Sequence, residues 1–214
     1  MTAPEPDLGP EVVLATRNPH KIAELREILA QTGVRVRLVG LDRFPDLPEV
    51  PETGLTFGDN AMLKASDVAH RTGLPAIADD SGLCVDVLGG MPGIFSARWS
   101  GKHGDDAANL DLLLAQISDV ADEHRQAHFA CAAALVIPGT PEGPGKQAQV
   151  VREGRIYGAL LRERRGENGF GYDPIFVPAG YDRTTAEMPP EEKNAISHRT
   201  RAFQALAKDL AGLL

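Results

Sequence analysis

The sequence lacks a long apolar run and has few cysteines. No stretch approaches the roughly 20 apolar residues that a helix needs to cross a bilayer, so we expect a soluble protein. Its 2 cysteines, Cys84 and Cys131, each lie in an apolar run, and neither has a second cysteine or a histidine at the spacing of metal ligands. We interpret them as buried, reduced thiols, which favours a cytoplasmic location.

The sequence also has fewer basic than acidic residues. The 22 lysines and arginines are outnumbered by 30 aspartates and glutamates, and the formal net charge is -8. This balance disfavours nonspecific binding to nucleic acid or to an anionic membrane, so an anionic ligand would need locally placed cations. Residues 1–10 contain three prolines and no basic segment followed by an apolar one, which predicts a flexible tail rather than a signal peptide.

The composition is that of a globular protein. Hydrophobic residues make up 43% and charged residues 24% of the 214 residues, enough to bury a core in one domain over residues 11–214. No internal repeat is present. Strands are predicted at Val12–Ala15, Val34–Val39 and Pro75–Asp79, with a further extended segment over Leu83–Val87. Helices lie between the first three strands, one from an Asn18 cap to Gly33 and one from Thr56, which has the capping-box spacing with Asp59, to Gly73.

The second half continues this alternation. The pattern predicts a helix over Leu110–Ile117, a central strand over His128–Ile137, an antiparallel neighbour over Val150–Tyr157 and a last helix from about Glu191. The segment Pro138–Gly145 between the two strands is predicted to be a solvent-exposed loop. We therefore expect an α/β fold with a mixed β-sheet flanked by helices, in two lobes around a central cleft.

The first polar motif lies between a buried strand and a helix N-terminus. Its residues are Thr16, Arg17, Asn18, Pro19, His20 and Lys21. Free backbone N–H groups and the positive end of the helix dipole make such a position a phosphate site, and Lys21 would add charge. A plain helix cap at Asn18 with a solvated Lys21 explains the same residues.

The second motif is Asp79-Asp80-Ser81-Gly82, which we interpret as an acidic turn after an apolar strand. Neighbouring side chains on a strand point to opposite faces, so only one carboxylate can face a given site. Asp80, next to the turn, is the better catalytic candidate, and Asp79 would brace a lysine or a helix N-terminus. An ordinary turn rich in Asp and Ser is the alternative.

Two further motifs lie near the C-terminus. In the segment from Gly169 to Pro174, glycines flank Phe170, whose ring could stack on a nucleobase, although Phe170 and Tyr172 could equally be core residues beside a turn. Lys193, Ser197, His198 and Arg199 cluster at the start of the last helix, where they could meet phosphates and a base edge. A solvated helix face explains any one of them.

Taken together, these segments resemble the Ham1-like inosine/xanthosine triphosphate pyrophosphatase family. The resemblance runs from Val12 almost to the end of the chain, in the family's order. Its matching segments are Thr16–Lys21, Glu52–Phe57 with Asn60-Ala61 and Lys64-Ala65, Asp79–Leu83, Gly89–Gly93, Ser96–Arg98, Gly169–Phe176 and Ser197–Arg199.

The resemblance implies a two-lobed mixed-sheet fold, a homodimer and a magnesium requirement. By motif position it makes Asp80 the general base and a metal ligand, and Glu52 a second metal ligand. It assigns phosphate binding to Thr16–Lys21 and Ser81, and base binding to Phe170, Gly171, Tyr172 and Asp173. Lys193, His198 and Arg199 would contact base and phosphates.

Three positions depart from the family pattern. Arg17 stands where many members have glycine, Pro51 stands where some have a second acid beside Glu52, and Pro138–Gly145 resembles an insertion. The change at position 51 leaves Glu52 as the only acidic candidate at that site.

The implied reaction is hydrolysis of dITP, ITP and XTP to the monophosphate and pyrophosphate, which would cleanse the nucleotide pool. We hypothesise that Asp80 orients and deprotonates a water at or near Mg²⁺. A site built for a 6-oxo purine leaves polar groups unpaired with adenine, at about 1–3 kcal/mol each. The alternatives are a pyrophosphatase for other modified nucleotides and a nucleotide-binding protein without activity.

Overall fold

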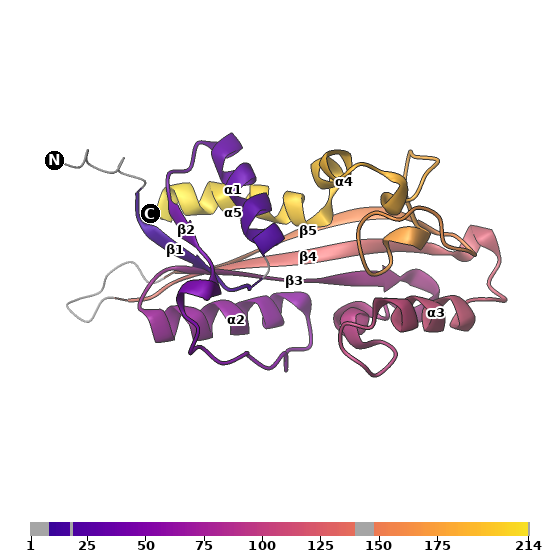
Figure 1. Cartoon of the computed structure of the whole chain (residues 1–214), viewed down its shortest axis with the longest axis horizontal. Coiled ribbons are helices and arrows are strands. Elements are labelled where there is room, and N and C mark those ends of the chain that lie inside the picture. The colour runs from indigo at the N-terminus through magenta and orange to yellow at the C-terminus, as the bar shows by residue number, and fades with distance from the viewer. Residues whose placement is uncertain (1–8, 18, 140–147, 214) are drawn as a thin grey trace.

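A mixed β-sheet runs through the whole length of the molecule (Figure 1). The computed structural model describes residues 9–17, 19–139 and 148–213, with backbone only for Pro19–Lys21 and residues 23–24. Within them the sheet has 6 strands in the order β2-β1-β3-β4-β5-β6. The strands are β1 (Glu11–Leu14), β2 (Arg37–Val39), β3 (Ala76–Val85), β4 (Gln126–Ile137), β5 (Ala148–Leu160) and β6 (Phe176–Pro178).

The strand directions explain the long crossovers at the start of the chain. β1 is parallel to both β2 and β3, and parallel neighbours need a connection over the sheet. The pairs β3–β4, β4–β5 and β5–β6 are antiparallel. The predicted mixed sheet, with a long central β4 and an antiparallel β5, is therefore confirmed.

Helices cover the sheet at both ends of its long strands. They are α1 (Pro19–Thr32), α2 (Phe57–Thr72), α3 (Asp106–Gln116), α4 (Pro190–Ile196) and α5 (His198–Leu213). In Figure 1, α1 and α5 lie on one side of the sheet and α2 on the other, while α3 and α4 lie towards the opposite end. The first two predicted helices are confirmed, and α2 carries the predicted Thr56–Asp59 capping box.

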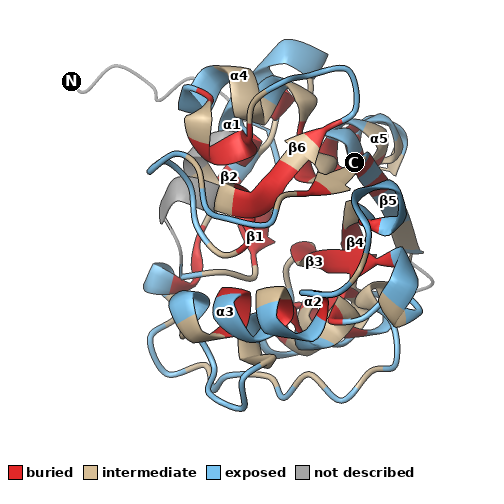
Figure 2. Cartoon of the chain, turned by 90° about the vertical axis from the view of Figure 1, so that its right-hand side faces the viewer, coloured by how far each residue is buried: buried red, intermediate tan, exposed pale blue. Residues whose placement is uncertain are grey.

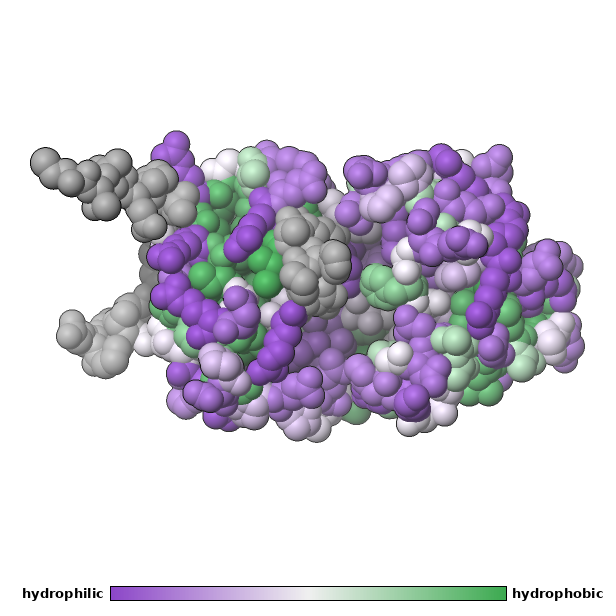
Figure 3. Space-filling view, in the orientation of Figure 1, coloured by the Kyte–Doolittle hydropathy of each residue, from purple (hydrophilic) through white to green (hydrophobic). Residues whose placement is uncertain are grey.

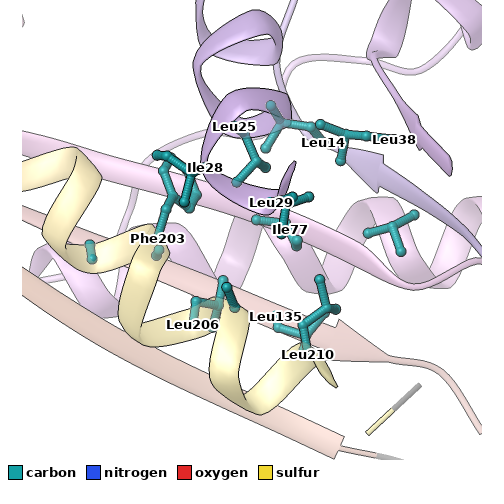
Figure 4. Close-up of a cluster of buried hydrophobic side chains, with 14 of the residues drawn as sticks. Leu14, Leu25, Ile28, Leu29, Leu38, Ile77, Leu135, Phe203, Leu206 and Leu210 are labelled. Carbon is teal, nitrogen blue, oxygen red and sulfur yellow. The ribbon is translucent and has the colours of Figure 1, made fainter. Parts of the chain in front are cut away.

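Buried side chains concentrate in the strands, as the red segments of β1, β3 and β4 in Figure 2 show. One core cluster joins α1 and α5 to the sheet, with Leu25, Phe203 and Leu206 meeting Ile77 and Leu135 (Figure 4). A second cluster lies under α2, and a third joins α3 to the far end of β3 and to β6. These three clusters hold the strand ends at which the polar motifs lie.

The interpretation of Asp79–Gly82 as a turn is wrong. β3 continues through this segment to Val85, and Asp80 and Ser81 pair with Ala132 and Cys131 of β4. The long neighbouring strand provides partners for the backbone of all ten residues of β3, which overrides the local turn preference. Gly82 has a different role: an added Cβ there would lie 2.4 Å from Ser96 Oγ, so the glycine permits close approach of the 3₁₀ segment Gly93–Arg98.

Other boundaries also differ from prediction. The strand expected over Val34–Val39 is only Arg37–Val39, and the extended segment expected to reach Val87 gives way to a 3₁₀ turn at Asp86–Leu88. The single last helix is two helices, because Ser197 is extended and its Oγ accepts a hydrogen bond from Thr200 N at 3.0 Å. Ser197 therefore ends α4 and caps α5.

The predicted tail and loop fall largely outside the described residues. Residues 1–8 of the tail and 140–147, which include most of Pro138–Gly145, are among the undescribed ones. Among the helices that the structure describes, none has both the length and the apolar character needed to cross a membrane.

Candidate active site

A cavity opens where β1 ends beside the longer β3. Within the described residues, β3 pairs with β1 only at Ala76 and Ile77, so the edge of β3 is uncovered from that point. The cavity has a volume of about 440 Å³, and its lining includes Thr16, Arg17, Glu52, Lys64 and Asp79. The first polar motif, through Thr16 and Arg17, and the acidic segment, through Asp79, therefore line one pocket.

Lys64 joins the two predicted metal ligands. Its ammonium, on α2, donates to Glu52 Oε1 at 3.0 Å and to Asp80 Oδ1 at 3.2 Å. All three side chains are less than one third exposed. Two carboxylates from separate segments thus converge on one cation. Lys64 and Glu52 line the cavity, whereas Asp80 is not among its lining residues.

A second cation contacts Glu52 from the other side. Arg98 Nη1 donates to Glu52 Oε2 at 3.1 Å, and its guanidinium lies 5.3 Å from the centroid of the Phe95 ring. Both oxygens of Glu52 are therefore paired. Arg98 also lines the cavity, so it contributes positive charge there.

The burial of this cluster changes its proton affinities. Burial raises the pKa of Asp80 above its usual value, and the nearby charge of Glu52 adds to the rise, against the opposing charge of Lys64. Burial also acts to raise the pKa of Glu52, but Lys64 and Arg98 outweigh it and the pKa is lowered. The two carboxylates face different environments, which is how an enzyme separates a proton acceptor from a permanently charged group.

Asp79 and Asp80 point to opposite faces of β3, as predicted. Asp79 is buried and its Oδ2 accepts from Arg199 Nε at 3.2 Å. One partner of Asp79 is thus an arginine of α5, and the expected bracing of a lysine or a helix N-terminus stays a prediction. Ser81, on the same face, lies with its Oγ 3.5 Å from Arg199 Nη2. Arg199 therefore links the acidic strand to the start of α5.

The segment Gly169–Asp173 presents Phe170 at the surface. Asp173 is buried; its Oδ2 accepts from Phe170 N at 2.8 Å and from Lys193 Nζ at 2.5 Å. The Lys193 ammonium also lies 4.9 Å from the centroid of the Phe170 ring, which is itself 64% exposed. The structure thus brings together three residues that were predicted to hold the base or contact it.

Tyr172 and Gly171, in the same segment, form hydrogen bonds to other parts of the protein. Tyr172 is buried and its hydroxyl donates to Ser96 O at 3.0 Å; burial and the nearby Asp106 raise the pKa of this phenol. Gly171 N donates to Asp106 Oδ2 at 2.9 Å. The tyrosine ring belongs to the core, which was the alternative that the sequence left open for Tyr172. Base binding at residues 171 and 172 stays a prediction.

Of the remaining predicted site residues, His198 and Arg17 have contacts that the structure describes. The His198 ring stacks on Phe129 with centroids 5.1 Å apart, and Arg17 Nη2 donates to Leu47 O at 2.8 Å while lining the cavity. Asn18 lies outside the described residues, as do the side chains of Pro19, His20 and Lys21. Their phosphate contacts stay predictions.

Sequence reasoning assigned no role to Lys64, Arg98 or Asn60. Asn60 is completely buried on α2 and its Nδ2 donates to Asp80 Oδ2 at 3.1 Å. Asn60 and Lys64 are four residues apart, which places them on one helix face. The sequence signal for these roles was the spacing of Asn60 and Lys64, two polar residues on one face of a helix that begins shortly after Glu52.

Comparison with known proteins agrees with this fold. The model of the Ham1 family matches residues 12–209. The chain therefore belongs to the Ham1 family.

Individual relatives match along almost their whole length. The dITP/XTP pyrophosphatase of Streptomyces avermitilis is 60% identical over 95% of this chain and 98% of that protein. That of Mycobacteroides abscessus is 56% identical over 95% of this chain and 96% of that protein. Among solved structures, a HAM1 protein from Coxiella burnetii aligns with a TM-score of 0.84 at 41% identity, covering 95% of this chain and 100% of that one.

Proposed function

We propose that this chain hydrolyses dITP, ITP and XTP to the nucleoside monophosphate and pyrophosphate, and so removes these purines from the nucleotide pool. Relatives that are 52–61% identical, over 95% of this chain and 96–98% of their own length, carry the name dITP/XTP pyrophosphatase. The observation that carries the proposal is the convergence of Glu52 and Asp80 on one cation position, next to the cavity that Thr16 and Arg17 also line.

The donor set of this cluster fits Mg²⁺. Magnesium is commonly held by one or two carboxylates together with phosphate oxygens of the substrate. Glu52 and Asp80 already surround one cation, the Lys64 ammonium. Among the residues that the structure describes, no three histidine, cysteine or acidic side chains are grouped to hold a metal. The two carboxylates would therefore need further oxygen ligands from the substrate, and we propose that Glu52 and Asp80 hold Mg²⁺ together with the triphosphate.

In the proposed reaction a water attacks the α-phosphorus. The bond from that phosphorus to the α–β bridging oxygen breaks, and its electron pair leaves on pyrophosphate. Asp80 takes a proton from the water, a role that suits a carboxylate whose pKa is raised by burial. A bound divalent ion would supply positive charge that offsets the charge of the triphosphate.

The other cations of the cavity hold the substrate. Lys64, Arg98 and Arg17 line one pocket, where they neutralise phosphate oxygens before reaction. The Phe170 ring has an exposed surface for stacking on the purine, and Lys193 and Asp173 supply a donor and an acceptor beside it. Stacking of a base on an aromatic ring contributes about 1–3 kcal/mol.

We also propose a cytoplasmic homodimer. Within the described residues neither cysteine forms a disulfide, and both are buried, which suits a reducing compartment. Hydrophilic residues cover most of the face shown in Figure 3, with smaller hydrophobic areas towards its two ends. Sedimentation of the purified chain at micromolar concentration tests the dimer.

A substrate panel tests the proposed activity. Purified protein is incubated with dITP, ITP, XTP, dATP, ATP and dUTP, with Mg²⁺ or with excess EDTA, and pyrophosphate is measured. We expect kcat/KM for dITP, ITP and XTP to exceed that for dATP and ATP by at least about 100-fold, and EDTA to abolish turnover. Equal rates across the panel, or turnover only of dUTP, would contradict the proposal.

A further inference from the structure

Asn60 connects the two segments that supply the candidate metal ligands. It is the fourth residue of α2 and is 0% exposed. Its Oδ1 accepts from Gly54 N at 2.8 Å, and its Nδ2 donates to Asp80 Oδ2 at 3.1 Å. One amide therefore joins the loop that follows Glu52 to the carboxylate of the proposed base.

The amide fixes the rotation of the Asp80 carboxylate. Oδ2 faces Asn60 while Oδ1 faces Lys64, so each oxygen has a donor from α2. Because a buried Asn side chain has a donor end and an acceptor end, the Gly54 bond decides which end faces Asp80. Reversal of the amide would place oxygen against carboxylate and N–H against N–H.

The surroundings of Asn60 leave little room for movement. An added Cβ at Gly54 would lie 2.7 Å from Asn60 Oδ1 and 2.9 Å from Asn60 N, so the loop lies directly against the helix. The capping box of Thr56 and Asp59 fixes the first turn of α2, and Asn60 N donates to Thr56 O at 3.1 Å. Asn60 is thus held from the backbone side as well.

We propose that Asn60 is a positioning residue for catalysis: it orients Asp80 for proton transfer and holds the Glu52 loop at the same site. This inference rests on the proposed pyrophosphatase activity. Asn60 is fully buried and is not among the lining residues of the cavity, so it acts through Asp80, and its loss should lower kcat and leave KM nearly unchanged.

Asn60→Asp is the sharpest test, because it keeps the size of the side chain and the oxygen that accepts from Gly54. The other oxygen then faces the Asp80 carboxylate without a donor. We expect kcat for dITP to fall by about 10- to 100-fold, the range for loss of a hydrogen bond to a charged group, with KM within about twofold. Asn60→Ala, which introduces no charge, should show the same pattern.

Asn109→Asp is a matched control. Asn109 is the fourth residue of α3 and is 1% exposed, and its Oδ1 accepts from Ser100 N at 2.7 Å. Its Nδ2 has no hydrogen-bond partner, so the substitution removes no such bond. Both Asp variants are checked by thermal melting. Asn109→Asp should keep kcat and KM within about twofold of wild type.

A double-mutant cycle with Asp80→Asn completes the test. If Asn60 acts through Asp80, Asn60→Asp changes kcat by less than about twofold in the Asp80→Asn background. An equal loss in both backgrounds, an unchanged kcat in either Asn60 variant, or a similar loss in Asn109→Asp overturns the proposal. Failure of wild type to hydrolyse dITP is a separate result, which would refute the proposed function instead.

Discussion

At the scale of single residues, Asp79 and Asp80 are neighbours with the same side chain but different surroundings, which suit them to different roles. Asp79 is 2% exposed and is neutralised by Arg199, which ties β3 to α5. Asp80 shares Lys64 with Glu52 and has a raised pKa. A group that accepts a proton during turnover must have some affinity for it, so Asp80 is the better base of the two.

Replacement of Asp80 by Asn should remove the proton acceptor with little change of shape. General-base catalysis contributes about 10²- to 10⁴-fold, and we expect kcat for dITP to fall by this amount. Thermal melting should show that the variant stays folded. Turnover at the wild-type rate in a folded Asp80→Asn protein would show that another group takes the proton.

Replacement of Phe170 by Ala should weaken substrate binding without unfolding the protein, because the ring is 64% exposed. Loss of about 1–3 kcal/mol of stacking corresponds to a rise in KM for ITP of about 5- to 150-fold. Tyr172→Phe is the control: it removes the buried bond to Ser96 O, which should cost about 1 kcal/mol of stability and leave KM unchanged. The opposite pattern would place the base on Tyr172.

At the scale of elements, the N-terminal turn of α2 connects local sequence to the site. The capping box fixes where the helix begins, and this start places Asn60 and Lys64 one turn apart beneath Asp80. The loop before the helix must approach closely, which explains why residue 54 has no side chain.

Gly54→Ala and Gly58→Ala should therefore have opposite effects. At Gly54 a new Cβ would lie 2.5 Å from Asp59 Cβ, whereas at Gly58 the nearest atom would be 3.6 Å away. We expect Gly54→Ala to lower both the free energy of unfolding and kcat. Gly58→Ala, inside α2, should raise the free energy of unfolding by about 0.5–1 kcal/mol, measured by urea denaturation. Similar effects of the two changes would mean that the close approach at Gly54 is unimportant.

The same elements show which features the sequence could predict. The capping box of α2 and the alternation of strands and helices are local patterns, and they were predicted correctly. The continuous β3 depends on a partner distant in the chain, namely β4. The break at Ser197 is local, because Ser197 Oγ accepts a hydrogen bond from Thr200 N. The roles of Asn60 and Lys64 depend on the packing of α2 against β3 at Asp80. The sequence does not show this contact, because Asn60 and Lys64 lie 20 and 16 residues from Asp80 in the chain.

At the scale of the whole molecule, the unequal strand lengths create the site. β1 has 4 residues and β3 has 10, so the sheet edge is open beside Asp79. Segments from β1, the Glu52 loop, α2 and β3 meet at this opening. The third core cluster, around Leu83 and Phe176, holds Tyr172 and thus the segment that carries Phe170.

The position of the phosphate that water attacks tests this account most directly. Wild-type protein is given ITP and Mg²⁺ in water enriched in ¹⁸O, and the masses of the products are measured. The account predicts one ¹⁸O atom in inosine monophosphate and none in pyrophosphate, because water attacks the α-phosphorus. Label in pyrophosphate, or release of inorganic phosphate in place of pyrophosphate, would contradict it.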